Sequence, residues 1–185
     1  MISHTIDMAE ILTLFLFLSF SFFFFDLEIL FWTELYVRMN DLALERLHKA
    51  GWTTDRKVDI SRIVNRYAKA GIDLPGSLRE FFTSFGFLEL DYVDERGNSE
   101  HHSINPHFGY SKSQLAHVLE WYNVNGMAYP VGSAFRDNMD ILYHDDGNFY
   151  LFMGGGPVIR CGNSVESFFN GLIGEDNQNW ENLDD

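Results

Sequence analysis

The stretch Met139–Met153, MDILYHDDGNFYLFM, constrains the fold of this chain more than any other part of it. It contains two apolar and aromatic runs, Ile141–His144 and Phe149–Phe152, joined by the four residues DDGN. Asp-Gly between two such runs is a strong β-hairpin signal, because the turn needs residues that tolerate positive φ. Both runs are almost continuously apolar, which is typical of strands that are covered on both faces. The stretch therefore predicts the central pair of strands in a sheet, with a helix layer on one side.

The rest of the chain alternates between helical and strand patterns. Apolar residues recur at helical spacing in five segments, each followed by a glycine that marks a helix end. These predicted helices cover about residues 42–50, 60–70, 75–85, 111–125 and 165–173. Strand patterns occupy 87–93, 129–132 and 158–161, and a polar edge strand is predicted at 99–104. Tight turns join the strands, so we expect a single α+β domain: a mainly antiparallel sheet with helices packed on it.

Residues 1–38 form a hydrophobic extension whose core, Ile11–Phe25, contains no charged residue. Its 15 residues are fewer than the ~20 that span a bilayer, and extension to Trp32 adds Asp26 and Glu28, which are costly at membrane depth. Three interpretations stay open: a reading frame started too early, with Met39 as the true start; a membrane anchor; or a secretion signal. An anchor would leave the domain in the cytoplasm, because basic residues follow the stretch. A secretion signal is the weakest of the three interpretations, because no basic n-region precedes the hydrophobic stretch.

Charge and cysteine content narrow the function and the compartment. The net charge is −14, and it is still −10 without residues 1–38. This charge argues against a nucleic-acid partner, because a phosphate-binding face needs clustered Lys and Arg. A basic protein partner is compatible with it. A single cysteine, Cys161, permits no internal disulfide and indicates a reducing compartment, so we predict a cytoplasmic protein. The acidic, Asn-rich residues 175–185 are predicted to be a disordered tail apart from Trp180.

No motif for a known reaction is present. The run Gly154-Gly155-Gly156 lacks the Lys and the following helix of a phosphate loop. His101, His102 and His107 are a poor metal set, because adjacent strand residues point to opposite faces and a solvated loop explains them better. Cys161 has no evident base partner and is more typical of a small buried side chain. We therefore expect a binding protein, with no catalytic residues, metal, cofactor or small-molecule substrate.

Four motifs in sequence order resemble one protein family. Residues 74–90, LPGSLREFFTSFGFLEL, resemble the LPxxLxxFFxxFGxLEL segment of the SUKH superfamily. Residues 47–56, LHKAGWTTDR, are similar to the LxxAGWxxxR opening of its third subfamily, and residues 164–172 are similar to its closing helix. The "PVG, hydrophobic strand, DG" region is matched by Tyr129-Pro130-Val131-Gly132, Ile141-Leu142-Tyr143, Asp146-Gly147 and Tyr150. The resemblance covers about residues 42–174 and predicts a SUKH-like domain at 39–174.

The resemblance implies an immunity protein of a bacterial polymorphic toxin system. Such a protein binds a cognate toxin domain, often a nuclease or deaminase, and occludes its active site inside the producing cell. An acidic surface is complementary to the basic cleft of an enzyme that acts on nucleic acid. Family members vary at their binding surfaces, so no contact residue is carried over from the resemblance. From the residues alone, the candidate partner-binding set is the exposed acids that flank the sheet: Glu89, Asp91, Asp137, Asp140, Asp145 and Asp146.

Two other functions stay open. One is a regulatory scaffold of the same fold that binds a different cytosolic protein. The other is an enzyme that uses the His101–His107 segment. An adjacent toxin gene favours immunity over the scaffold, and a bound metal would favour the enzyme. A membrane partner is expected only if residues 11–32 are expressed.

Overall fold

The structure, a computed structural model, describes residues 39–184. The hydrophobic extension and the three interpretations of it lie outside the described residues. The described helices are α2 (Asp41–Lys49), α3 (Ser61–Lys69), α4 (Gly76–Phe85), α5 (Lys112–Leu115), the 3₁₀ turn η1 (Glu120–Tyr122) and α6 (Val165–Ile173). The described strands are β1 (Glu89–Val93), β2 (Ser99–Ser103), β3 (Ala128–Ala134), β4 (Met139–His144), β5 (Phe149–Phe152), β6 (Val158–Gly162) and β7 (Glu181–Asn182). Within residues 39–184, no helix is long and apolar enough to cross a membrane.

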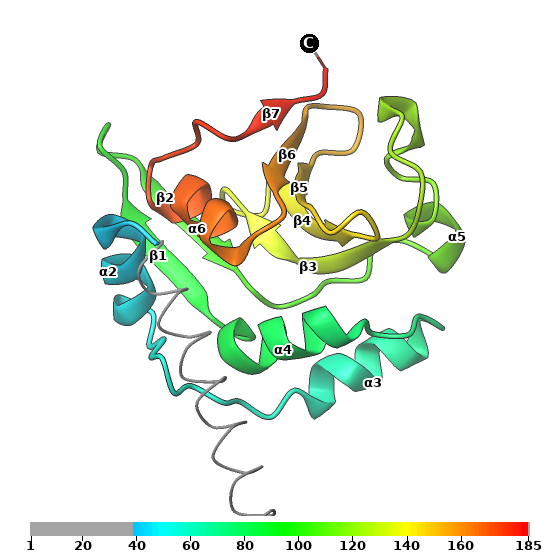
Figure 1. The fold of residues 1–185 in the computed structure, drawn as a ribbon, viewed down its shortest axis with the longest axis horizontal. Coiled ribbons are helices and arrows are strands. Elements are labelled where there is room, and N and C mark those ends of the chain that lie inside the picture. The colour runs from blue at the N-terminus through cyan, green and yellow to red at the C-terminus, as the bar shows by residue number, and fades with distance from the viewer. Residues whose placement is uncertain (1–38, 185) are drawn as a thin grey trace, which may run out of the picture. The chain divides into compact units, whose positions relative to one another are not determined.

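The described strands form one antiparallel sheet in which neighbours in sequence are neighbours in space. The order runs from β1 at one edge to β7 at the other, with β4 in the middle (Figure 1). This confirms the predicted α+β architecture with a mainly antiparallel sheet. The polar strand at 99–104 was expected at an edge, but β2 lies between β1 and β3. Its only register pair with β3 is Ser103 with Ser133, so its polar residues remain partly accessible despite the internal position.

Gly132 makes the close approach of β2 and β3 at this register pair geometrically possible. A Cβ atom at this position would lie 1.9 Å from the backbone oxygen of Ser103, closer than any non-bonded contact allows. The register of β3 also shifts between Pro130 and Gly132, which marks a bulge in the strand. The two-stranded β1–β2 unit therefore joins the rest of the sheet at a point where only glycine fits.

The hairpin predicted from Met139–Met153 is formed by β4 and β5, which pair from Asp140 with Phe152 to Tyr143 with Phe149. Its turn is built as the sequence indicates. Gly147 has φ +85°, and the Asp146 carboxylate accepts a 2.9 Å hydrogen bond from the backbone N–H of Asn148. Every residue of β5 is buried. The expectation that both faces of this hairpin are covered is confirmed.

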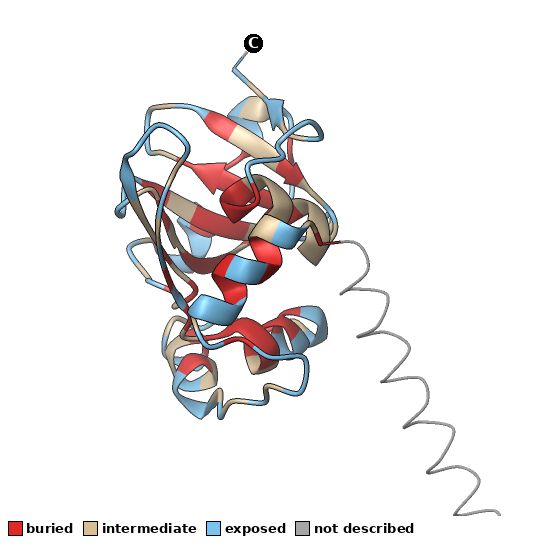
Figure 2. Cartoon of the chain, turned by 90° about the vertical axis from the view of Figure 1, so that its left-hand side faces the viewer, coloured by how far each residue is buried: buried red, intermediate tan, exposed pale blue. Residues whose placement is uncertain are grey.

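One face of the sheet carries a helix layer held together by aromatic rings. Phe81 of α4 contacts Phe149 of β5 and Phe169 of α6, with ring centres 5.4 and 6.2 Å apart. Phe168 of α6 stacks on Phe149 at 4.6 Å. Figure 2 shows the buried sides of these helices turned inward and their exposed sides turned to solvent. Each helix has one apolar face because its apolar residues recur at three- and four-residue spacing.

The opposite face of the sheet, called here the outer face, is covered over β4–β6 by the connection between β2 and β3. Leu119 and Val124 of this connection join Leu142, Tyr150 and Phe152 in a second buried cluster. The long helix predicted from Ser111 to about residue 125 is wrong: α5 has one turn and η1 follows it. In a continuous helix Leu119 and Val124 would point about 140° apart, so the helix breaks to bury both.

The acidic end of the chain departs from the predicted disorder. Glu181 and Asn182 form β7, which pairs with Arg160 and Ile159 of β6. Trp180 lies directly on α6, where a Cβ on Gly171 would come within 2.2 Å of its ring. The large apolar contact area of a tryptophan is enough to hold an otherwise polar segment against the domain.

Candidate protein-binding surface

The six acidic residues proposed from the sequence separate into two groups. Glu89, Ser103, Ser133 and Asp140 stand in one row across β1–β4, on the outer face of the sheet. Asp91 follows Glu89 two residues along β1 and therefore shares that face. Asp137, in the β3–β4 turn, accepts a 2.5 Å hydrogen bond from the Ser133 hydroxyl. The acidic sheet face is defined here as Glu89, Asp91, Asp137 and Asp140.

His101 lies at the centre of this acidic sheet face. Its Nδ1 is 2.8 Å from the Asp91 carboxylate, and its Nε2 is 3.4 Å from the Glu89 carboxylate. The hydrogen bond to Asp91, with the negative charges of Asp91, Glu89 and Asp137, raises the pKa of His101 above its usual value. The exposed carboxylates of β1 therefore surround a histidine whose protonated form they stabilise.

Asp140 marks the border between the open and the covered parts of the outer face. Its carboxylate accepts a 2.8 Å hydrogen bond from the hydroxyl of Tyr110, at the start of the β2–β3 connection. Burial, and then this hydrogen bond, raise the pKa of Tyr110 to about 12. Asp140 is half-buried, so it serves the attachment of the connection more than a free surface.

Asp145 and Asp146 lie at the other end of β4, roughly 16 Å along the strand from Asp140. Asp145 accepts hydrogen bonds from the Tyr129 hydroxyl at 2.9 Å and the Met127 backbone N–H at 2.8 Å. Asp146 accepts one from the Tyr150 hydroxyl at 2.6 Å. These two carboxylates fasten the hairpin turn to neighbouring strands. The structure thus brings four of the six proposed acids to one area and leaves these two apart.

Charge is distributed unequally between the helix layer and the sheet. Residues 39–86, which form α2–α4, carry eight basic and six acidic side chains. Residues 87–185 carry four basic and sixteen acidic side chains. The surplus of negative charge therefore belongs to the sheet and its connections, and the helix layer is close to neutral.

The residues considered for catalysis or metal binding do not converge in the described part of the chain. Within residues 39–184 no group of three His, Cys, Asp or Glu side chains is arranged to hold a metal ion. His101 and His102 point to opposite faces of β2, as expected, but both belong to the strand and not to a solvated loop. Cys161 is fully buried, and burial raises the pKa of its thiol far above its usual value. It is a core residue.

His102 belongs to a buried polar network that sequence reasoning did not identify. The backbone N–H of Phe135 donates to His102 Nδ1 at 3.1 Å, so the ring proton resides on Nε2. Nε2 donates to the Tyr92 hydroxyl at 2.9 Å, and this hydroxyl donates to the Leu172 carbonyl at 2.9 Å. Burial lowers the pKa of His102 to about 3, so the ring is neutral. The chain of donors fastens β1 and β2 to the end of α6.

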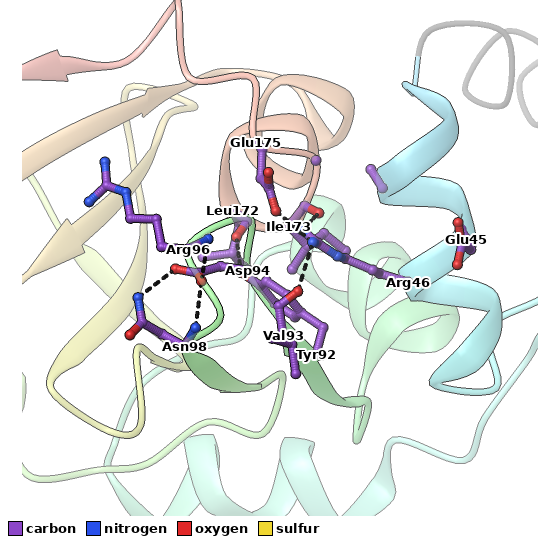
Figure 3. A network of polar contacts seen from close by, with 12 residues as sticks. Glu45, Arg46, Tyr92, Val93, Asp94, Arg96, Asn98, Leu172, Ile173 and Glu175 are labelled. Atoms are coloured by element: carbon purple, nitrogen blue, oxygen red, sulfur yellow. Dashed lines mark hydrogen bonds and ion pairs between the residues drawn. The ribbon is translucent and has the colours of Figure 1, made fainter.

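Arg46 extends the same network on the α2 side (Figure 3). Its guanidinium carbon lies 3.8 Å from the centre of the Tyr92 ring. It donates to the Ile173 carbonyl at 2.6 Å and to the Glu175 carboxylate at 2.5 Å. Four elements, α2, β1, β2 and α6, are thereby joined by hydrogen-bonded polar groups, of which Arg46 and His102 are buried and Tyr92 is half-buried. This indicates a structural role.

The family-like motif around Trp52 is also structural. Trp52 is 1% exposed and stacks on Phe85, with ring centres 5.5 Å apart. Arg56 donates to the Ser84 carbonyl at 2.6 Å and to the Gly86 carbonyl at 2.8 Å. These are carbonyls at the C-terminal end of α4, which a helix leaves without partners. The motif therefore holds the α2–α3 loop against α4.

Trp121 is a candidate contact residue that the sequence did not reveal. It lies in η1 and is 93% exposed, and Val93 at 60% is the other large exposed hydrophobic residue among residues 39–184. The sequence pattern predicted a helix here that would continue to residue 125. The apolar positions of that predicted helix were Leu115, Val118, Leu119 and Tyr122, and the signal for an exposed indole was that Trp121 lies to one side of them.

Together, the α+β fold, the acidic sheet face and the exposed aromatic residue define a domain suited to binding another protein. The model of the SUKH-3 immunity protein family matches residues 39–175. The chain belongs to the SUKH-3 immunity protein family. Residues 1–38 lie outside the match. Neither the curated proteins nor the solved structures compared with the chain gave a match.

Proposed function

We propose that this protein is a non-catalytic immunity protein that binds a cognate toxin domain and occludes its active site. The observation that carries the proposal is the family match, which covers nearly all of the described domain. An immunity protein works inside the cell that makes the toxin, so its place of action is the cytoplasm. Occlusion needs tight binding and no chemical step by the immunity protein.

The charge distribution supports a basic toxin domain of the nuclease or deaminase type. An enzyme that acts on nucleic acid has a positively charged cleft, because it binds phosphates. The sheet half of this protein, with sixteen acidic against four basic side chains, is complementary to such a cleft. Opposite charge accelerates the encounter of two proteins and disfavours wrong partners.

The acidic sheet face is the area that we propose meets the basic cleft. Glu89 and Asp91 are exposed, and their carboxylates project from β1 on the part of the outer face that the β2–β3 connection leaves open. Asp137 is exposed in the adjoining turn. Asp145 and Asp146, proposed from sequence as part of the same set, are expected to contribute less, because their carboxylates serve the hairpin turn.

Co-expression tests the function. A candidate toxin domain from a neighbouring gene is expressed in bacteria with and without this chain, and survival is counted. We expect the toxin alone to kill the cells and the full chain to restore survival. If cells that express both proteins in confirmed soluble form still die, the immunity proposal fails for that toxin.

The alternative of a regulatory scaffold makes a different prediction. A scaffold would bind a cytosolic protein that has no toxic activity, and no toxin gene would adjoin its own. The family match favours immunity over this alternative. Protection of cells in the co-expression experiment would exclude the scaffold as the main role.

A further inference from the structure

Trp121 stands in solvent on a turn that is otherwise well anchored. Its side chain is 93% exposed, whereas Leu119 and Val124 on either side of the turn are 1% and 7% exposed. A tryptophan loses a large favourable burial free energy when it is left in water. A side chain of this size on the surface is therefore a feature to explain, especially where its neighbours pack normally.

The turn that carries Trp121 has a defined geometry. The backbone N–H groups of Tyr122 and Val124 both donate to the Leu119 carbonyl, at 3.0 and 3.2 Å. Asn123 adopts a left-handed conformation with φ +58°, and its N–H donates to the Glu120 carbonyl at 3.0 Å. At the start of the connection, Ser111 and Gln114 form a complete capping box. The backbone that presents Trp121 is therefore fixed before binding and loses little conformational freedom on binding.

Two carboxylates lie close to the turn that carries Trp121. Glu120 precedes Trp121, and its carboxylate lies 2.5 Å from His117 Nδ1. The charge of Asp184 acts on the hydroxyl of Tyr122, whose pKa is raised first by burial and then by this charge. The connection covers the outer face over β4–β6, and the acidic sheet face is the open part of that same face. A single partner that docks on the outer side can meet both.

We propose that Trp121 is the anchor of the toxin interface and enters an apolar pocket with a basic rim on the toxin domain. The inference rests on the proposed function and adds to it the residue that supplies most of the binding free energy. Tryptophans are enriched among the few residues that dominate protein interfaces. The acids around it supply charge complementarity, and an Arg or Lys of the toxin at the rim would stack on the indole.

The test is the affinity of the full chain for the toxin domain encoded beside the gene, measured by titration calorimetry. Trp121→Ala should weaken binding by about 30-fold or more, and Trp121→Phe should weaken it less, because a ring remains. Lys69→Ala, at an exposed position of α3 in the helix layer, is the control and should change affinity by less than about 3-fold. The midpoint of thermal unfolding should be unchanged in all three variants, because the Trp121 and Lys69 side chains are both exposed.

A second readout follows the indole itself. The difference in acrylamide quenching between the natural chain and Trp121→Phe reports this one tryptophan. It should be readily quenched in the free protein and protected in the complex. If the toxin binds Trp121→Ala as tightly as it binds the natural chain, the proposal that Trp121 anchors the interface is overturned, and the proposed immunity function is not affected. No binding by the natural chain would overturn both.

Discussion

His101 and His102 are consecutive residues of β2, yet their pKa values move in opposite directions because they face opposite sides of the sheet. The carboxylate of Asp91 raises the pKa of His101. Burial lowers the pKa of His102 to about 3. The two-residue period of a strand is the cause, since it places one ring among exposed acids and the other among buried groups.

His102 should make the domain less stable in acid. Its unfolded form gains a proton below about pH 6.5, while the folded form stays neutral down to about pH 3. The free energy of unfolding should therefore fall as pH drops through this window, with a slope that approaches about 1.4 kcal/mol per pH unit from this group. His102→Gln removes that slope.

Urea unfolding of the natural chain and His102→Gln at pH 7, 6 and 5 checks this. The variant should be less stable at pH 7, since it disturbs a buried network. The difference in the free energy of unfolding between the natural chain and the variant should become smaller as the pH falls. A gap that stays constant or widens would contradict a neutral buried His102.

His101 should have the reverse effect. Its pKa is raised in the folded state, so its contribution to stability is complete below about pH 6.5 and disappears as pH rises through the folded pKa. His101 is 35% exposed, so the contribution should be below about 1 kcal/mol. His101→Gln should lower the unfolding midpoint at pH 6 and leave it unchanged at pH 9. An equal decrease of the unfolding midpoint at pH 6 and pH 9 would show that the charge of His101 does not contribute to stability.

Gly132 should be intolerant of any side chain. A Cβ would lie 1.9 Å from the Ser103 backbone oxygen, so Gly132→Ala must part β2 from β3 at their one register pair. We expect a loss of about 3 kcal/mol or more in the free energy of unfolding. Gly154→Ala is the matched control, because nothing lies within 4 Å of its added methyl group, and it should change stability by less than about 0.5 kcal/mol. Similar losses in both variants would contradict the close approach.

Arg56 should stabilise the end of α4 through both of its hydrogen bonds. Arg56→Ala should cost about 2 kcal/mol, because it strands the Ser84 and Gly86 carbonyls. Arg56→Lys should recover only part of this loss. An ammonium can donate to one of the carbonyls, but it lacks the planar fork with which the guanidinium reaches both. Arg79→Ala, at an exposed site of α4, should be nearly neutral. If Arg56→Ala leaves the free energy of unfolding in denaturant unchanged, this role for the motif is excluded.

The position of the negative charge, and not its amount, should decide toxin affinity. Glu89→Gln with Asp91→Asn removes two charges from the acidic sheet face, and Glu80→Gln with Asp55→Asn removes the same two from exposed sites before β1. The pair at Glu89 and Asp91 should weaken toxin binding by about 10-fold at low salt. The difference in affinity between this double variant and the natural chain should shrink as the salt concentration rises. Equal effects of the two pairs on the dissociation constant would place the interface elsewhere.

Local patterns in the sequence predicted those parts of the fold that local physics decides. The Asp-Gly turn of the hairpin, the Ser111 capping box and the three helices before β1 are each set by residues within a few positions of one another. The helix predicted through residue 125 failed because Leu119 and Val124 both pack against strands distant in sequence. The contact of Trp180 with Gly171 is likewise a tertiary contact, so composition alone indicated disorder there.

The candidate surface was predictable to a smaller extent. Four of the six proposed acids share an area because alternation along β1 and pairing with β2 and β3 place them there. Asp145 and Asp146 were drawn into the same set by their charge, but the turn geometry uses their carboxylates. Trp121 was missed because exposure depends on where the chain breaks its helix.

Stoichiometry of inhibition tests the central claim most directly. The purified toxin domain is titrated with the full chain, and its remaining enzymatic activity is measured after increasing times of incubation. Occlusion predicts a linear decrease that reaches zero at one molecule per toxin and does not change with time. Complete inactivation at a small fraction of one equivalent, progressing with time, would mean that the protein acts as a catalyst, and undiminished activity at excess would mean that it does not neutralise this toxin.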